Sequence, residues 1–143
     1  MKIQLRETPF NPWEELQAYQ AQQSAIKSGY GAASIFVGTM RDFNQNKSIQ
    51  SMYLEHYPGM TDQYLHKLAD EALNKWDVLD IFIIHRYGSI MPADTIVLLA
   101  VWSAHRDAAF SANRYLIEEL KTRAPLWKKE TLLADNSTQW VIP

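Results

Sequence analysis

Two uninterrupted apolar runs require a buried sheet at the centre of any fold that this chain adopts. The runs are residues 81–84 (Ile-Phe-Ile-Ile) and 96–101 (Ile-Val-Leu-Leu-Ala-Val). Both lack the polar alternation of a strand with one face in water, and both are rich in β-branched residues, so each indicates a strand covered on both faces. Only a short connection containing glycine and proline separates them. We therefore predict paired strands over residues 78–86 and 94–102.

A helix is predicted to begin at Asn11. Asparagine is a favourable cap, and Pro12 fits the first helical position because the N–H that proline lacks would have no helical partner there. Trp13, Leu16 and Ile26 mark the side of this helix that we expect to be buried.

Two further helices are predicted from apolar residues at helical spacing. Thr61 can cap the first of them, in which apolar residues recur from Leu65 to Trp76. The other runs over residues 107–123. It must end at or before Ala124, because the residue that precedes a proline disfavours the helical conformation.

The remaining segments predict shorter strands and a long polar loop. Residues 2–6 alternate between apolar and polar side chains, as a half-buried strand does. Further strands are predicted over 32–37 and 48–57, a loop over 38–47, and one or two short strands over 131–142 around a turn at 135–137. This order predicts an α+β fold in which three helices pack on a mixed or antiparallel sheet, and we expect residues 1–143 to form a single domain.

The composition excludes several kinds of chemistry. The chain of 143 residues contains no cysteine, so it has no disulfide, no thiolate nucleophile and no cysteine-bound metal. With 14 Lys and Arg against 16 Asp and Glu, it lacks the basic excess typical of nucleic-acid-binding proteins. No apolar run approaches the length of about 20 residues that a membrane helix needs, and the first residues lack the apolar core of a signal peptide. We therefore expect a soluble, cytoplasmic protein that binds neither nucleic acid nor a membrane.

Residues 103–106 (Ser-Ala-His-Arg) are a candidate anion site, because they follow a buried strand and precede a helix. At such a position a rigid scaffold presents side chains and helix N-terminal N–H groups to a ligand, which makes His105 and Arg106 candidate binding residues. The alternative, favoured by the pattern alone, is that both are ordinary surface residues. Arg41, in the predicted loop, is a third candidate for binding an anion through its planar guanidinium.

A second candidate site is the cationic segment at the end of the last predicted helix. Its basic residues are Lys121, Arg123, Lys128 and Lys129. Cations at a helix C-terminus also stabilise the helix dipole, which is an alternative explanation. If Lys121 and Lys128 are aimed at one point, each disfavours the charged form of the other, which helps one of them to transfer a proton or attack an acyl carbon. None of the four histidines has ligand spacing to another, so we predict no metal site.

Five short blocks occur in a specific order and spacing. They are residues 36–41 (Phe-Val-Gly-Thr-Met-Arg), 54–61 (Leu-Glu-His-Tyr-Pro-Gly-Met-Thr), 85–88 (His-Arg-Tyr-Gly), 103–106 with Ala109 and Phe110, and 120–130 (Leu-Lys-Thr-Arg-Ala-Pro-Leu-Trp-Lys-Lys-Glu). Together these blocks resemble the catalytic (large) subunit family of molybdopterin synthase.

This resemblance implies an α/β-hammerhead core with an additional β subdomain. It also implies a homodimer that binds two copies of a small ubiquitin-like sulfur-carrier subunit, giving a heterotetramer. Such a sulfurtransferase moves sulfur from the C-terminal thiocarboxylate of the carrier to cyclic pyranopterin monophosphate, forming the dithiolene of molybdopterin in molybdenum cofactor biosynthesis. No cofactor is implied. The reaction suits a chain without cysteine, because the sulfur arrives already activated.

The resemblance also implies roles for the candidate residues. Lys121 is expected beside the thiocarboxylate carbon as the acid, base or electrostatic catalyst, with Lys128 as its catalytic partner. The expected substrate-binding residues are Arg41, His105 and Arg106 at the pterin phosphate, and Phe36 and Ile117 on the apolar side of the pocket. The alternative is a non-catalytic anion- or protein-binding homodimer of the same fold. We expect a second copy to cover the edge of a C-terminal strand over 138–142.

Overall fold

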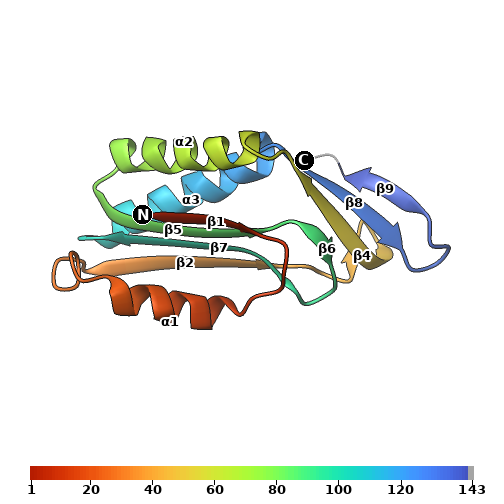
Figure 1. Ribbon diagram of the computed structural model, residues 1–143, viewed down its shortest axis with the longest axis horizontal. Helices are drawn as coiled ribbons and strands as arrows, with labels where there is room; N and C mark the ends of the chain where they lie inside the picture. Colours follow the sequence, from red (N-terminus) through yellow and green to blue (C-terminus); the bar gives the residue numbers. More distant parts are fainter. Residues whose placement is uncertain (142–143) are drawn as a thin grey trace.

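A central sheet with the strand order β1-β5-β7-β2 organises the molecule (Figure 1). The computed structural model describes residues 1–141. The strands of this sheet are β1 (Lys2–Arg6), β5 (Val78–Arg86), β7 (Thr95–Ser103) and β2 (Ala32–Thr39). β1 is parallel to β5, and the other two pairs are antiparallel. The predicted pairing of the two apolar runs is confirmed, with Ile83 opposite Leu99.

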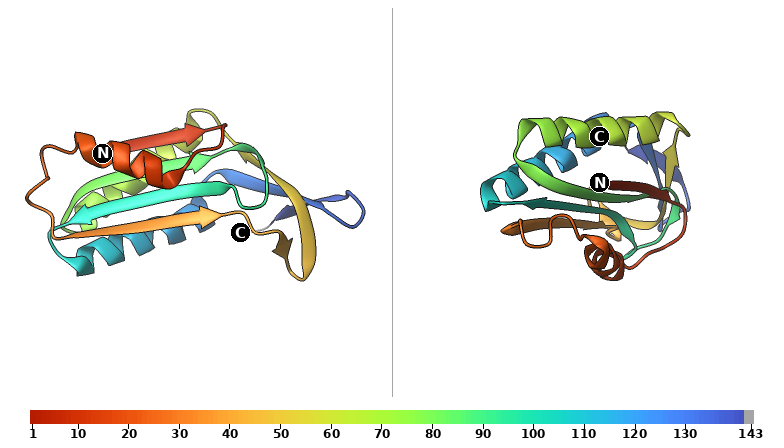
Figure 2. Two further views of the ribbon diagram at one scale, coloured as in Figure 1. Left: turned by 90° about the horizontal axis from the view of Figure 1, so that it is seen from below. Right: turned by 60° about the vertical axis from the view of Figure 1, so that its left-hand side comes forward.

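Helices cover both faces of the central sheet (Figures 1 and 2). One face carries α2 (Met60–Lys75) and α3 (Arg106–Arg123), and the other carries α1 (Pro12–Gln22). Ile81 and Ile83 of β5 pack in the core under α2 and α3. Phe82 and Ile84 pack on the opposite side with Leu16 of α1. Because side chains alternate across a strand, a strand that is apolar at successive positions contributes to two cores. Within residues 1–141, no helix has the length and apolar character needed to cross a membrane.

A second sheet lies beyond one end of the central sheet (Figure 1). Its strands are β3 (Phe43–Asn44), β4 (Lys47–His56), β6 (Gly88–Ile90), β8 (Leu126–Leu132) and β9 (Thr138–Val141). β4 pairs with β3, β6 and β8, and β8 also pairs with β9. A separate core surrounds Met52, Leu54 and Ile90, and Ile96 packs against both this core and the main one. The predicted α+β fold and its additional β subdomain are thus confirmed.

The predicted buried side of α1 is partly wrong. Leu16 packs against the core, but the Trp13 side chain is 60% exposed, and Pro12 is buried instead. Asn11 caps the helix as predicted, accepting a hydrogen bond from the Trp13 N–H. Because Pro12 faces the core, the next residue, about 100° further round the helix, points to solvent. Ile26 packs on the same core from beyond the end of α1.

Thr61 does not cap α2, contrary to the prediction. The helix begins at Met60, two residues earlier than a cap at Thr61 implies, after Gly59 adopts a φ of 82°, which residues with side chains rarely tolerate. Thr61 is buried, and its hydroxyl accepts a hydrogen bond from the Tyr57 N–H and donates one to the Pro125 carbonyl, both at 3.0 Å. The start of α2 is therefore attached to the segment that leads into β8.

The cationic segment is more regular than predicted. β8 begins at Leu126, several residues earlier than expected, so Lys128 and Lys129 lie in a strand rather than in a turn after the helix. The lysines conceal this strand because a charged side chain breaks the apolar alternation whether it points inward or outward. β9 is confirmed through Val141, and the predicted last position, Ile142, lies outside the described residues.

Several strands lie at the edges of the two sheets. β2 forms one edge of the central sheet, and β3 and β9 form edges of the second sheet. β3 falls inside the segment 38–47 that was predicted to be a loop, and β2 extends to Thr39 in the same segment. Trp140 of β9 is 54% exposed in the single chain. The C-terminal edge that the sequence predicts is therefore present.

We predict that Thr61→Val lowers the free energy of unfolding by about 2 kcal/mol, because it leaves the Tyr57 N–H and the Pro125 carbonyl without this partner. Thr122→Val is the matched control, since Thr122 is exposed on α3 and donates to the Glu118 carbonyl of the same helix. We expect the control to change stability by less than about 0.5 kcal/mol. Urea unfolding followed by circular dichroism measures both, and equal stability of the two variants would contradict the structural role of Thr61.

Candidate functional site

Three predicted site residues lie on elements that meet at the junction of the two sheets. Lys121 is in the last turn of α3, Arg41 follows the end of β2, and Lys128 is in β8. Lys128 is paired with Leu54 of β4, whose side chain is buried in the core of the second sheet. Directly opposite residues of an antiparallel pair point to the same face. The Lys128 side chain therefore lies on the inner face of this sheet.

The other two cations affect the pKa of Lys128. Burial is the largest cause that lowers the pKa of Lys128 below its usual value, and the positive charges of Lys121 and Arg41 lower it further. The carboxylate of Glu130 acts in the opposite direction. A lowered pKa increases the fraction of neutral amine at a given pH, and a neutral amine can accept a proton.

Arg41 is exposed and is held by a neighbouring aromatic ring. Its guanidinium carbon lies 4.9 Å from the centroid of the Phe43 ring. Such a cation–π contact leaves the positive charge and the N–H donors of an arginine available to a further ligand. This geometry suits recognition of an anion such as a phosphate or a carboxylate.

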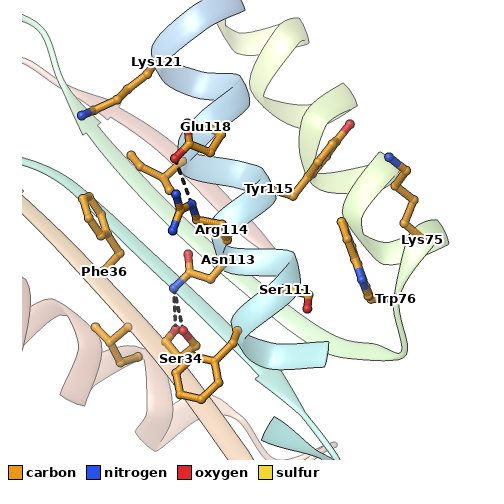
Figure 3. Close-up of a pocket in the computed structure, with 13 residues that line it drawn as sticks. Ser34, Phe36, Lys75, Trp76, Ser111, Asn113, Arg114, Tyr115, Glu118 and Lys121 are labelled. Carbon is orange, nitrogen blue, oxygen red and sulfur yellow. Dashed lines mark hydrogen bonds and ion pairs between the residues drawn. The ribbon is translucent and has the colours of Figure 1, made fainter. Parts of the chain in front are cut away.

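A groove of about 930 Å³ runs between α3 and the edge strand β2 (Figure 3). Figure 3 shows Lys121 and Phe36 on the β2 side of α3, whereas Lys75 and Trp76, which also line the cavity, lie on the other side of the helix beside α2. Ile117 also lines the groove. The structure therefore brings Phe36, Ile117 and Lys121, all of them predicted site residues, to one cavity.

Asn113 in the same groove was not expected from the sequence. Its side-chain nitrogen donates hydrogen bonds to the carbonyl and the hydroxyl of Ser34, at 3.1 and 3.0 Å, as Figure 3 shows. Its Oδ1 atom is buried and has no hydrogen-bond partner among the described residues. An asparagine in the middle of an amphipathic helix carries no signal in the sequence that would distinguish it from a surface residue.

His105 and Arg106 lie at the opposite end of α3 from Lys121. β7 ends at Ser103 and α3 begins at Arg106, so the predicted position between a strand and a helix is confirmed. Both side chains are exposed, and the His105 side chain accepts no hydrogen bond from the N–H groups at the start of the helix. At about 1.5 Å per residue, the helix separates Arg106 from Lys121 by roughly 22 Å. One chain alone does not bring these residues together with Lys121.

His85 is a buried residue of this region that sequence analysis did not select. It is the penultimate residue of β5, and its side chain is 3% exposed. Its Nδ1 atom lies 2.7 Å from the carbonyl oxygen of Arg86. Burial is the main cause that lowers the pKa of His85 to about 4, and the positive charge of Lys128 contributes. The signal that was available is the polar pair His85-Arg86 at the end of an otherwise apolar strand.

The site is suited to anions rather than to metal ions. Within residues 1–141, no group of three or more His, Asp or Glu side chains is arranged to hold a metal. Lys121, Lys128 and Arg41 supply positive charge and hydrogen-bond donors, and Phe36 supplies an aromatic surface beside them. Such a combination can bind an anionic ligand that carries a flat ring, and Lys128 can move a proton within it.

The sequence is similar to a known family over most of its length. The family model for the MoaE protein matches residues 6–123. The molybdopterin synthase catalytic subunit of Pseudomonas aeruginosa is 46% identical over 130 residues, which cover 91% of this chain and 84% of that relative.

Solved structures agree with this similarity. Molybdopterin synthase from Staphylococcus aureus superposes with a TM-score of 0.82 at 30% identity, covering 96% of this chain and 94% of the other. The molybdopterin biosynthesis MoaE protein from Burkholderia ambifaria gives a TM-score of 0.79 at 38% identity, covering 98% of this chain and 88% of the other. These matches confirm the resemblance predicted from the five sequence blocks. The chain belongs to the MoaE protein family.

Proposed function

We propose that this chain is the catalytic subunit of a molybdopterin synthase. It transfers sulfur from the C-terminal thiocarboxylate of a small ubiquitin-like carrier to cyclic pyranopterin monophosphate, forming the dithiolene of molybdopterin. The observation that carries the proposal is the meeting of Lys121, Lys128 and Arg41 at one site. There, the positive charges of Lys121 and Arg41 lower the pKa of Lys128. Membership of the MoaE family and the name of the Pseudomonas relative support it.

The charge of the site matches the charge of both substrates. A thiocarboxylate and a phosphate monoester or diester are anions at neutral pH, and a cluster of cations around the half-buried Lys128 stabilises charge that develops on them during reaction. The chain has no cysteine of its own, so the sulfur must be carried in by the partner. Lys128 and Lys121 then act on the acyl carbon and its leaving group rather than on a protein thiol.

The two lysines take different parts in this reaction. Lys121 is exposed at the end of α3 and lines the groove, so it can reach the carbonyl group of an entering carrier tail. Lys128 is half-buried and its pKa is lowered, which fits a group that exchanges protons. We assign electrostatic stabilisation of the acyl group to Lys121 and proton transfer to Lys128.

In a homodimer, His105 and Arg106 of one copy can lie near Lys121 of the other copy, although they are far from Lys121 of their own chain. If two α3 helices approach in antiparallel orientation about a two-fold axis, the N-terminus of one helix lies beside the C-terminus of the other. His105 and Arg106 of one copy then complete the anion site around Lys121 of the other.

Two further expectations belong to this proposal. Residues 1–143 act as one domain, which is supported by the packing of Ile96 against the cores of both sheets. The cytoplasm is the location in which we expect the reaction.

We predict that Lys121→Ala lowers sulfur transfer at least 100-fold while leaving folding and carrier binding nearly intact, because it removes a charge from the reacting acyl group. Lys128→Ala should cost a similar or smaller factor. Lys129→Ala is the control, since Lys129 is adjacent to Lys128 in β8 and lies on the outer face, paired with Tyr53. Turnover and thermal melting are measured on the same samples. Near-normal turnover of the Lys121 variant would refute the catalytic role assigned to Lys121, whereas absence of turnover in the unaltered chain would favour a non-catalytic binding homodimer.

We predict that Arg41→Ala and His105→Ala weaken binding of the pterin substrate more than binding of the carrier. Both side chains are expected at the phosphate and the ring rather than along the carrier tail. Arg106→Lys should also weaken pterin binding, because a point charge cannot replace a two-pronged hydrogen bond to phosphate. Calorimetric titration of each variant with each partner separates the effects, and equal losses for both partners would refute this assignment.

We predict that active sites are shared between the two copies of a dimer. Lys121→Ala and Arg106→Ala should each be nearly inactive alone, but co-expressed chains should regain about a quarter of normal turnover, because random pairing makes half of the dimers mixed and each of these has one intact site. Light scattering over a dilution series should first show a stable dimer without the carrier. A monomer at micromolar concentration, or no recovery on co-expression, would contradict a shared site.

A further inference from the structure

The imidazole of His85 is a buried titratable group to which the proposed reaction gives no role. The strand neighbours of His85 are Leu5 in β1 and Val97 in β7, and both belong to the core under α2 and α3. Because paired residues of adjacent strands share a face, the His85 side chain lies on the side of the sheet that α3 covers. This is the side on which α3 ends at Lys121 and Arg123.

The hydrogen bond of His85 defines which ring nitrogen carries the hydrogen. A carbonyl oxygen only accepts, so the Nδ1 atom that lies 2.7 Å from the Arg86 oxygen must be the donor. Burial keeps the ring neutral at physiological pH, and a neutral imidazole has one N–H. The Nε2 atom therefore carries a lone pair and is an acceptor. The ring holds the two nitrogens at non-adjacent positions, so Nε2 is directed away from the backbone that binds Nδ1.

Lys128 lies in the second sheet, on the face that adjoins the end of β5. In β4, Leu54 is paired on one side with Lys128 of β8 and on the other with Gly88 of β6. Gly88 follows His85 by three residues, at the point where the chain leaves β5 and enters the second sheet. The inner face that carries the Lys128 side chain therefore adjoins the end of β5. The positive charge of Lys128 is also one of the charges that act on His85.

The ammonium group of Lys128 has repulsive neighbours and needs acceptors. Lys121 from α3 and Arg41 from the loop after β2 oppose its charge, and Glu130 from its own strand favours it. Glu130 already accepts hydrogen bonds from the side chains of Asn44 and Gln139, at 3.0 and 3.3 Å. A half-buried cation without compensating dipoles is costly, and a neutral ring nitrogen with a lone pair supplies such a dipole without adding charge.

We propose that His85 is a positioning residue for Lys128, whose ammonium group it orients toward Lys121 by presenting the lone pair of Nε2 across the junction of the two sheets. The role assigned to Lys128 rests on the proposed function, but the placement of His85 does not. A charged imidazole could not do this, because it would add a further cation to Lys121, Lys128 and Arg41. The neutral state that burial imposes on His85 is thus a requirement of the site.

The placement is tested by an NMR titration of His85 that does not depend on activity. In the unaltered chain we expect the neutral form with hydrogen on Nδ1 and a pKa of about 4. Lys128→Gln should raise this pKa, because a positive charge is lost, but not to the value of a free histidine, because burial remains. Lys129→Gln, on the outer face of the same strand, should leave it unchanged. An unchanged pKa in Lys128→Gln would overturn the proposal.

The positioning role is tested by the kinetics of two substitutions. His85→Phe keeps a flat ring but has no lone pair, and we expect kcat to fall about tenfold or more with KM for the carrier unchanged. His85→Gln retains an acceptor and should recover most of the loss. Normal kcat in a folded His85→Phe variant would overturn the proposal, and so would equal losses in both. If His85→Phe does not fold, the NMR titration of His85 in Lys128→Gln still tests the proposal. If the unaltered chain makes no molybdopterin, the proposed function fails while the titration still tests His85.

Discussion

The antiparallel pairing of β5 with β7, inside a sheet buried on both faces, is the constraint on which the rest of the structure depends. Successive residues of β5 serve opposite cores, Ile81 and Ile83 under α2 and α3, Phe82 and Ile84 toward α1. α3 packs on this pair through residues such as Leu116 and Leu120, and its length determines where Lys121 emerges. The chain then leaves β5 through Gly88 into the second sheet, whose central strand β4 holds β8 and therefore Lys128. The candidate site lies where the end of α3 meets the second sheet.

At that junction, the partial burial of Lys128 beside two other cations is unfavourable, but it places positive charge where an anion can bind. Burial and the charges of Lys121 and Arg41 act together to lower the pKa of Lys128, and only a carboxylate or an incoming anion relieves the repulsion. The repulsion among these cations raises the free energy of the site. Binding of an anion such as a thiocarboxylate or a phosphate reduces that repulsion, which favours binding. The Thr61 hydroxyl stabilises this arrangement from outside, because it connects the start of α2 to the carbonyl of Pro125 just before β8.

Sequence periodicity predicts the elements whose packing depends mainly on the burial of regularly spaced apolar side chains. The strands around 81–84 and 96–101 and the helices ending near Lys75 and Arg123 follow apolar patterns, and the structure confirms them. Local patterns failed where a side chain is determined by distant partners. Lys128 lies in a strand that was not predicted, because its charge interrupts the apolar alternation. The Thr61 hydroxyl donates a hydrogen bond to the carbonyl of Pro125, which is distant in the sequence. His85 is buried by elements that are also distant in the sequence. Among the candidate site residues, Phe36, Ile117 and Lys121 line one groove, whereas the length of α3 separates His105 and Arg106 from them within one chain.

The most direct measurement of the central claim is the formation of molybdopterin by the purified, unaltered chain mixed with thiocarboxylated carrier and cyclic pyranopterin monophosphate. We expect molybdopterin to form, with one thiocarboxylate consumed for each dithiolene sulfur, and no product to form when the carrier ends in an ordinary carboxylate. If a folded chain that binds both partners yields no molybdopterin, the cationic site described here is a binding site without the proposed chemistry.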